Sequence, residues 1–205
     1  TKLRNCALEP EVQDLIIFLK KMGSDIRWVG KRSIDIIGVN KLKPTKHKVI
    51  FDRIEAGTYI IASALTKGNL KVNNVDPKIM KTEIEILKKM GVNIIERGNS
   101  LIINNLKKIK GTKIKTEPYP GFPTDLQAQI MVLLCKANKS SIVQENIFEN
   151  RFMHVAELNR MGAKISIKGN KAISQGNINF APAELMATDL RASVSLILAA
   201  LTAKG

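Results

Sequence analysis

The sequence predicts an α/β fold made of a repeated unit with the order strand, helix, strand, helix, strand, strand. Three observations support it: an amphipathic helix pattern that occurs three times, an isoleucine-rich hairpin pattern after each copy, and a second helix pattern that begins with aspartate. Copies of the first pattern end at Gly23, Gly91 and Gly162, which gives spacings of 68 (91 − 23) and 71 (162 − 91) residues. Self-similarity at a near-constant spacing indicates equivalent supersecondary units.

The amphipathic helix pattern covers residues 15–26, 83–94 and 154–165. Offsets of −1, −4 and −7 from each final glycine place apolar residues on one face of an α-helix. These residues are Met22, Leu19 and Ile16, then Met90, Leu87 and Ile84, then Met161, Leu158 and Val155. We expect each helix to end at its glycine, which adopts the left-handed C′ conformation at little cost. In the second copy, Asp76 and Pro77 stand where a cap and a first turn are expected.

A two-stranded hairpin is expected after each amphipathic helix. Isoleucines stand at +3 and +11 from the glycine in every copy, as Ile26 and Ile34, Ile94 and Ile102, and Ile165 and Ile173. Turn-forming glycines lie between them at Gly30, Gly98 and Gly169. Two apolar runs separated by a short glycine-containing turn are typical of a hairpin.

The second helix pattern is 17 residues long and begins at Asp52, Asp125 and Asp189. Aspartate is a good N-cap because its carboxylate accepts hydrogen bonds from the free amides of the first turn. The residues that follow are largely apolar, so we expect buried helices, with strands after the first two near Leu70 and Ile142. Such helices can pack together at the centre and leave the sheets and amphipathic helices outside.

Composition restricts the class of protein. The chain has 205 residues, of which 44 % are hydrophobic and 25 % charged, which is typical of a globular protein of one ordinary or two small domains. We see no membrane-spanning stretch and no signal peptide, so a cytoplasmic location is expected. The net charge of +15 favours an anionic partner, which could be nucleic acid, an acidic membrane surface or a phosphorylated small molecule. Few aromatic residues weaken the nucleic-acid interpretation.

Four segments closely resemble the enolpyruvyl transferase family: DRIEAGTYIIASALTKG from Asp52, PYPGFPTDLQAQ from Pro118, IFENRFMHVAELNRMGAKI from Ile147 and MATDLRASVSLILAALTAKG from Met186. The resemblance covers nearly the whole chain. It implies an inside-out α/β barrel of two lobes, each with three copies of the unit in a pseudo-threefold arrangement. Residues 1–50 would form the C-terminal end of one lobe. Residues 51–205 would form most of the other, as two units plus the start of a third.

The resemblance also implies an activity. It is the transfer of the enolpyruvyl group from phosphoenolpyruvate to the 3′-hydroxyl of UDP-N-acetylglucosamine, with release of phosphate, the first committed step of peptidoglycan synthesis. No cofactor and no metal are expected, and the partners would be the two substrates rather than nucleic acid or membrane. The family's reactive-cysteine loop has no counterpart here, because Cys6 and Cys135 do not match it. We therefore expect a fragment of a longer enzyme, inactive alone. A basic nucleic-acid-binding module and an inert sugar-nucleotide-binding fragment are the alternatives.

Asp125 and Ile147 are the first two candidate site residues. Asp125 could simply cap its helix. The resemblance instead implies a catalytic carboxylate that contacts the sugar 3′-hydroxyl and accepts its proton, as well as binding the substrate. Ile147 could be a core residue at a strand end, whereas the resemblance implies a contact with the nucleotide sugar through main-chain groups.

Arg151 and Arg191 are each expected near a helix N-terminus, where a cation is disfavoured and needs compensation. An ion pair, for instance between Arg191 and Asp189, is one explanation. The resemblance implies the other, in which both arginines face the cleft between the lobes and bind the negative groups of the substrates. It also places Asp189 among the substrate-binding residues, although capping and contacts between lobes are its expected main roles. His154 is expected to be structural, and His47 to be solvated.

Overall fold

The computed structural model describes residues 1–104, 107–187 and 189–204. Two residues of the segment that begins at Met186, Thr188 and Gly205, lie outside the described residues. The chain divides into two compact units. The first comprises Thr1–Phe51 with Pro118–Pro120, and the second comprises Asp52–Glu117 with Gly121–Gly205.

The first unit is one sheet and one helix. Its elements are β1 (Lys2–Arg4), α1 (Pro10–Lys21), β2 (Asp25–Trp28) and β3 (Ser33–Ile37). The strands are antiparallel in the order β1-β3-β2, and Ile16 of α1 packs with Ile26 and Ile34 of the sheet. These are residues that the helix and hairpin patterns assign to the apolar face, so the patterns are confirmed here.

His47 packs against α1 rather than standing in solvent. Its Nε2 atom lies 3.0 Å from Oδ2 of Asp14, and its ring lies 5.2 Å from the ring of Phe18. Its side chain is only 8 % exposed. The expectation of a solvated His47 is therefore wrong, because the segment after β3 returns along the helix.

The second unit contains two groups of elements that follow the same plan. The first group is α2 (Arg53–Thr66), β4 (Asn69–Asn73), α3 (Lys81–Lys89), β5 (Ile94–Glu96) and β6 (Ser100–Asn104). The second is β7 (Lys113–Lys115), the 3₁₀ turn η1 (Thr124–Leu126), α4 (Gln127–Cys135), β8 (Ser141–Gln144), α5 (His154–Arg160), β9 (Ile165–Lys168) and β10 (Lys171–Ser174). Helix α6 (Leu190–Ala200) opens a third. The predicted order of strands and helices is thus complete in the second group.

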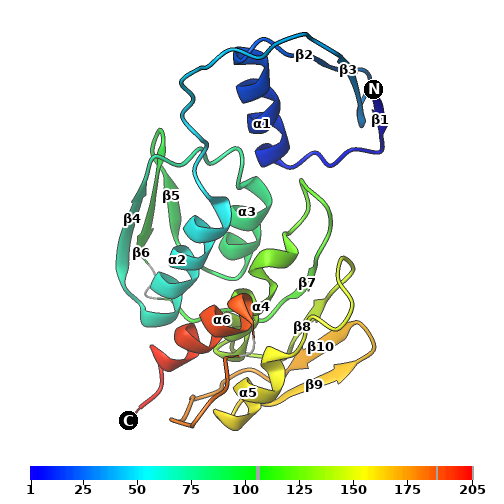
Figure 1. Cartoon of the computed structure of the whole chain (residues 1–205). Coiled ribbons are helices and arrows are strands. Elements are labelled where there is room, and N and C mark those ends of the chain that lie inside the picture. Colours follow the sequence, from blue (N-terminus) through cyan, green and yellow to red (C-terminus); the bar gives the residue numbers. More distant parts are fainter. Residues whose placement is uncertain (105–106, 188, 205) are drawn as a thin grey trace. The chain divides into compact units, whose positions relative to one another are not determined.

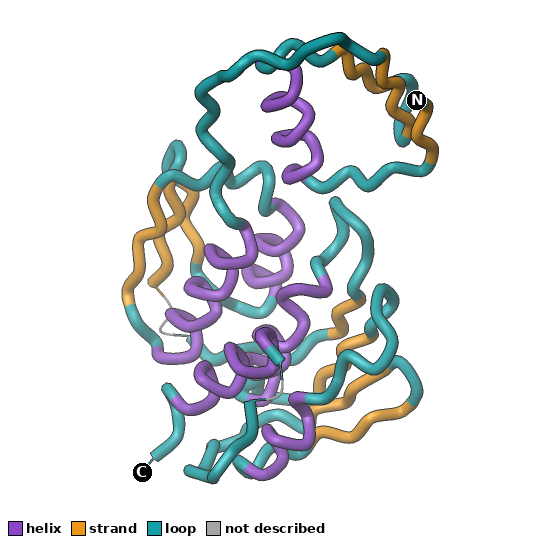
Figure 2. The backbone as a smooth tube through the Cα atoms, in the orientation of Figure 1, coloured by secondary structure: helices purple, strands orange, loops and turns teal. Residues whose placement is uncertain are grey.

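Helices occupy the middle of this unit and sheets its flanks. The sheet β4-β6-β5 and the sheet β7-β8-β10-β9 lie on opposite sides of α2 and α4 (Figure 1). Figure 2 shows the same layering, with strands outside and helices between them. In the larger sheet β7 runs parallel to β8 and the other neighbours are antiparallel. This is the inside-out α/β arrangement that the resemblance implies.

The central helices form the core. Every residue of α4 is buried, and α4 contacts both α2 and α6. Where α2 meets η1, a Cβ on Gly57 would lie 2.6 Å from Cδ1 of the buried Leu126, so only glycine fits without a shift. The buried character predicted for the aspartate-led helices is confirmed for α4 and for one face of α2, whereas it is wrong for the exposed face of α6, where Ile197 is 62 % exposed.

The ends of the amphipathic helices follow the sequence more closely than their beginnings. Gly23, Gly91 and Gly162 have φ values of 101°, 94° and 89°, which confirms the left-handed helix ends. Helix α3, however, begins at Lys81 rather than beside Asp76. The Asp76 carboxylate instead accepts a hydrogen bond from the amide of Lys78 at 3.0 Å, which stabilises a separate turn. Across the described part of the chain, no helix has the length and apolar character needed to cross a membrane.

Candidate functional site

The three aspartates that begin equivalent helices have different roles. Asp52 accepts hydrogen bonds from the amides of Ile54 and Glu55, at 2.7 and 3.0 Å. Asp189 does the same for the two amides at the start of α6, at 2.8 and 3.0 Å. Asp125 lies inside η1, one turn before α4, and its side chain accepts no backbone amide among the described residues. Capping is therefore confirmed at two positions and wrong at Asp125, whose carboxylate is free for other contacts.

The carboxylate of Asp125 is held between two arginines. Its Oδ1 atom lies 3.1 Å from Nη2 of Arg151 and 2.6 Å from Nη2 of Arg191. The anticipated ion pair between Arg191 and Asp189 is not formed: Asp189 binds the main-chain amide of Arg191, while the guanidinium reaches Asp125. The structure thus brings together three of the candidate residues, from η1, the segment before α5, and the first turn of α6.

The two guanidinium groups are restrained to different degrees. Arg151 also donates from Nη1 to Oγ1 of Thr124 at 3.2 Å, and its guanidinium carbon lies 4.7 Å from the centre of the Phe148 ring. Arg191 makes its only described side-chain ion pair with Asp125, and its Nε has no hydrogen-bond partner among the described residues. Arg151 is therefore fixed on three sides, whereas Arg191 retains donors for a further acceptor.

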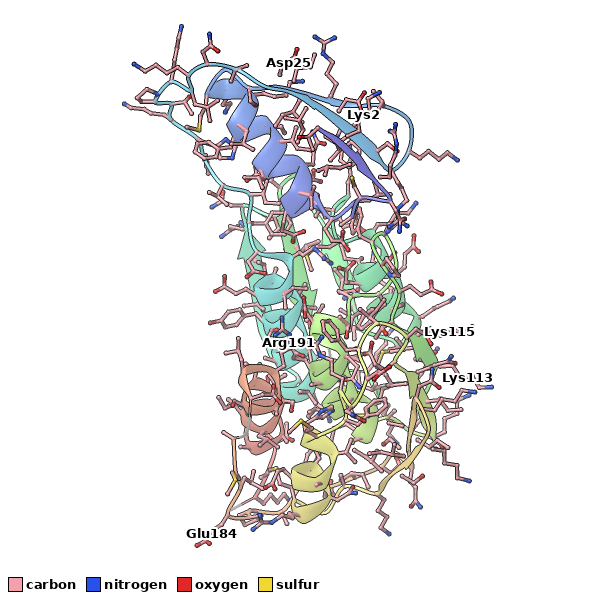
Figure 3. The ribbon with its side chains drawn as sticks, turned by 45° about the vertical axis from the view of Figure 1, so that its right-hand side comes forward. Lys2, Asp25, Lys113, Lys115, Glu184 and Arg191 are labelled. Atoms are coloured by element: carbon pink, nitrogen blue, oxygen red, sulfur yellow. The ribbon has the colours of Figure 1, made fainter. Side chains whose placement is uncertain are left out.

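A cavity of about 350 Å³ lies beside this cluster. Its lining includes both arginines, Asp189, His154, Thr124 and Phe148. In Figure 3, Arg191 lies among the helices of the second unit, whereas Lys113 and Lys115 extend away from β7. Guanidinium groups beside a partly open cavity favour ligands with carboxylate or phosphate groups, because their fixed donors match two oxygens at once.

Ile147 lies beyond the end of β8 and is 38 % exposed, so the alternative of a core residue at a strand end is wrong. Its amide donates to Oε1 of Glu145 at 2.8 Å. Together with Phe148, Asn146 and other residues it lines a second cavity of about 790 Å³. No described residue donates a hydrogen bond to its carbonyl oxygen, which is the main-chain group left for a ligand.

His154 lies within the smaller cavity's wall. Burial lowers its pKa from 6.5 to about 4, Asp189 acts in the opposite direction, and Arg151 adds to the lowering. The ring is consequently neutral at neutral pH, and its Nε2 has no hydrogen-bond partner in the described structure. The pKa of Asp189 is lowered, mainly by the hydrogen bond from the amide of Ala192.

Three further residues belong to the site but were not among the candidates: Thr124, Glu145 and Phe148. Thr124 and Phe148 lie within segments that resemble the family. Thr124 and Phe148 contact Arg151 directly, and Glu145 binds Thr124. A charged residue directly after the strand 141–144 is only a weak indication of a site residue, because a solvated glutamate gives the same pattern. Only the fold brings Thr124 and Glu145 together.

The described chain has two free cysteines, of which Cys6 is half-buried and Cys135 is buried. Cys135 is buried, and burial raises the pKa of its thiol to about 11, so little reactive thiolate forms at neutral pH. No group of three or more histidine, cysteine or acidic side chains within the described ranges could hold a metal ion.

Comparison with known proteins gives consistent matches. The family of EPSP synthase (3-phosphoshikimate 1-carboxyvinyltransferase) matches residues 1–205. A UDP-N-acetylglucosamine 1-carboxyvinyltransferase from Pelagibacter ubique (strain HTCC1062) is 67 % identical over 205 residues, and one from Clostridium acetobutylicum is 52 % identical over 205. Each match covers 100 % of this chain and 49 % of the relative. The chain therefore spans about half the length of the curated relatives it matches.

Solved structures agree on the fold. The enolpyruvyl transferase NikO from Streptomyces tendae superimposes with a TM-score of 0.89 at 26 % identity, over 99 % of this chain and 49 % of that one. EPSP synthase from Acinetobacter baumannii gives a TM-score of 0.67 at 21 % identity, over 91 % of this chain and 47 % of that one. The second likeness concerns the fold alone.

Proposed function

Because the chain belongs to the EPSP synthase family of enolpyruvyl transferases, we propose that it supplies part of the site that transfers an enolpyruvyl group from phosphoenolpyruvate to UDP-N-acetylglucosamine. Identities of 67 % and 52 % to proteins named for that sugar nucleotide support this acceptor over shikimate phosphate. The observation that carries the proposal is the shared contact of Arg151 and Arg191 with one oxygen of Asp125.

Asp125 is proposed as the general base. Addition of the sugar 3′-hydroxyl to C2 of phosphoenolpyruvate forms a C–O bond and breaks the C2–C3 double bond, while C3 takes up a proton and the hydroxyl loses its own. Loss of phosphate then breaks the C2–O bond to phosphorus, and loss of a proton from C3 restores the double bond in the product. Oδ1 of Asp125 is occupied by the two arginines, whereas Oδ2 accepts no hydrogen bond from the described residues and can take the proton. A base positioned in this way contributes typically about 10²- to 10⁴-fold.

The remaining candidate residues are proposed to bind the substrates. Arg151 and Arg191 would bind their carboxylate and phosphate groups through charge-assisted hydrogen bonds. Ile147 would use its carbonyl oxygen, since its amide is engaged by Glu145. Asp189 would keep the first turn of α6 in place at the cavity wall and contact the substrate from there.

The domain assignment is part of the proposal. Residues 1–50 would complete one lobe of the enzyme, and residues 51–205 would form most of the other. The division of the described chain between Phe51 and Asp52 supports this assignment. The enzyme would act in the cytoplasm at the first committed step of peptidoglycan synthesis, without a cofactor.

The test rebuilds a full-length enzyme by joining this chain to the remaining half of the Pelagibacter relative. We expect phosphate release that requires both phosphoenolpyruvate and UDP-N-acetylglucosamine, and none from the 205-residue chain alone. Titration calorimetry with the sugar nucleotide and with an oligonucleotide separates the two partner classes. Tight oligonucleotide binding without sugar-nucleotide binding would overturn the proposal.

A further inference from the structure

Glu145 is buried at the centre of the loops that carry the candidate site. It directly follows β8 and is only 3 % exposed. No lysine or arginine of the described chain forms an ion pair with it. Burying a carboxylate in this way is costly unless hydrogen bonds replace the lost hydration, so its stability depends on its hydrogen-bond donors.

Four donors meet the two oxygens of this carboxylate. Oε1 accepts from Oγ1 of Thr116 at 2.7 Å and from the amides of Ile147 and Phe148 at 2.8 and 3.1 Å. Oε2 accepts from Oγ1 of Thr124 at 2.9 Å. An ionised carboxylate is an acceptor only, and all of its described contacts come from donors. One side chain therefore ties together the segment after β7, the turn η1 and the segment after β8.

Thr124 connects Glu145 to the ionic cluster. Its hydroxyl donates to Glu145 and accepts from Nη1 of Arg151 at 3.2 Å. The same guanidinium donates from Nη2 to Asp125. Because Glu145 takes the hydroxyl hydrogen, an oxygen lone pair of Thr124 is directed to Arg151, and the arginine is held in the position from which it contacts Asp125.

We propose that Glu145 is a positioning residue that fixes the Arg151–Asp125 pair through Thr124 and fixes the main chain at Ile147 and Phe148 directly. The inference rests on the proposed transferase function and deepens it. Glu145 would act through two sets of contacts. The first branch is its hydrogen bond from Thr124, which positions Asp125, the proposed proton acceptor, by way of Arg151. The second branch is its hydrogen bonds from the amides of Ile147 and Phe148, which position the main chain proposed to contact the sugar nucleotide.

Glutamine cannot replace Glu145 in either orientation. With its oxygen toward Thr116 and the two amides, its NH₂ group faces Thr124, whose oxygen must then accept from two donors while its own hydrogen loses its acceptor. With the amide reversed, the NH₂ group faces three donors. A buried donor left without an acceptor is unfavourable, so the loops must shift.

The two branches predict different kinetic effects in the rebuilt enzyme. Thr124→Val keeps the side-chain volume and removes only the first branch. We expect a fall in kcat of about tenfold or more with the KM for UDP-N-acetylglucosamine unchanged, because misplacing a catalytic group slows chemistry. Glu145→Gln disturbs both branches, so kcat falls and this KM rises, each by about tenfold or more. Thr124→Ser, which retains the hydroxyl, restores kcat.

Combining the variants separates positioning from general stability. If Glu145 acts on kcat through Thr124, the effects of the two substitutions on kcat do not add in the double variant. Glu96→Gln removes an equal charge from an exposed site paired with Lys88, and it serves as the matched control. We expect this control to change neither kcat nor the KM for UDP-N-acetylglucosamine by more than about twofold, which corresponds to the usual deviation from additivity between independent sites.

The failure of this inference and the failure of the proposed function give different results. Kinetic constants of Thr124→Val and Glu145→Gln within about twofold of the parent would overturn the inference. If the rebuilt parent neither turns over nor binds the sugar nucleotide, the proposed function fails. In that case, amide hydrogen exchange in the 205-residue chain tests the positioning role of Glu145. Faster exchange at the amides of Ile147 and Phe148 in Glu145→Gln supports this role, and unchanged exchange refutes it. Should Glu145→Gln not fold, Thr124→Val carries the test alone.

Discussion

Nη2 of Arg191 lies 2.6 Å from Oδ1 of Asp125, although the two residues belong to different copies of the repeated unit. The contact joins the first turn of α6 to η1, just before α4, and the helices α4 and α6 pack together. A second arginine, Arg151, shares the same oxygen. Two cations around one carboxylate oxygen leave the other oxygen directed elsewhere, which is the arrangement that the proposed chemistry uses.

Asp125→Asn tests the proton acceptor. The amide keeps the size of the side chain and an oxygen for the arginines, but it cannot take a proton. We expect kcat of the rebuilt enzyme to fall by about 10²- to 10⁴-fold, with only a small change in sugar-nucleotide binding. Steady-state kinetics and calorimetry check the two parts. Asp76→Asn, at an exposed turn outside the site, should have no effect; equal losses from both variants would refute the assignment.

Arg191→Ala tests anion binding. Hydrogen bonds to charged groups contribute about 1.5–3 kcal/mol, so we expect substrate binding to weaken by about 10- to 100-fold. Arg191→Lys should recover little of this, because an ammonium group lacks the planar fork of donors. Lys115→Ala removes the same charge from an exposed side chain of β7, which lies away from Arg191 (Figure 3). A comparable loss in that variant would mean that net charge, not the site, attracts the ligand.

His154 makes a distinct contribution to stability against acid. Its folded pKa of about 4 lies below the unfolded value near 6.5, so the unfolded chain takes up the proton first. Stability is therefore lost as the pH falls from about 6.5 to about 4, by about 3 kcal/mol in total, and no further below that. The lowered pKa of Asp189 acts in a more acidic range, because its contribution disappears only as the pH falls through its folded value.

His154→Phe should remove most of this loss. Urea unfolding followed by circular dichroism between pH 7 and pH 4, with ionic strength held constant, measures it. Parallel curves for the parent and the variant across that range would show that the histidine is not the cause.

Gly176→Ala tests a close approach of two backbone segments. Gly176 has φ of 80°, and a Cβ there would lie 2.5 Å from the carbonyl oxygen of Ala137. We expect destabilisation of about 3 kcal/mol or more, from the left-handed conformation together with the steric conflict. Gly98→Ala is the matched control, because φ is 55° and no atom lies within 4 Å of the added carbon. It should cost only about 1–2 kcal/mol in urea unfolding.

Features of the fold that depend on nearby residues could be predicted from sequence. The apolar offsets before Gly91 and the glycine itself determine a helix and its end within a dozen residues, and the structure follows them. The start of α3 could not be located, because Asp76 can stabilise either a helix or a separate turn. Local hydrogen bonding permits both, and packing decides between them.

The site was only partly accessible to the same reasoning. The family resemblance identified Asp125, Arg151 and Arg191 individually. It did not predict that both arginines form ion pairs with Asp125. The sequence left open an ion pair between Arg191 and Asp189, which stands two residues earlier in the chain. The capping role takes up the carboxylate of Asp189, and the fold offers Asp125 instead. Glu145 was missed because Thr116 and Thr124, distant in sequence, give it its role.

The short turn η1 separates helix capping from ion pairing in the repeated element. Asp52 and Asp189 are committed to holding their helices, so replacing either one weakens the scaffold. At the middle copy, the turn η1 begins one residue before the equivalent aspartate, so Asp125 lies inside the turn and caps no helix of the described chain. A substitution at Asp125 therefore changes the ionic cluster without removing a helix cap, whereas the same substitution at Asp52 or Asp189 removes one.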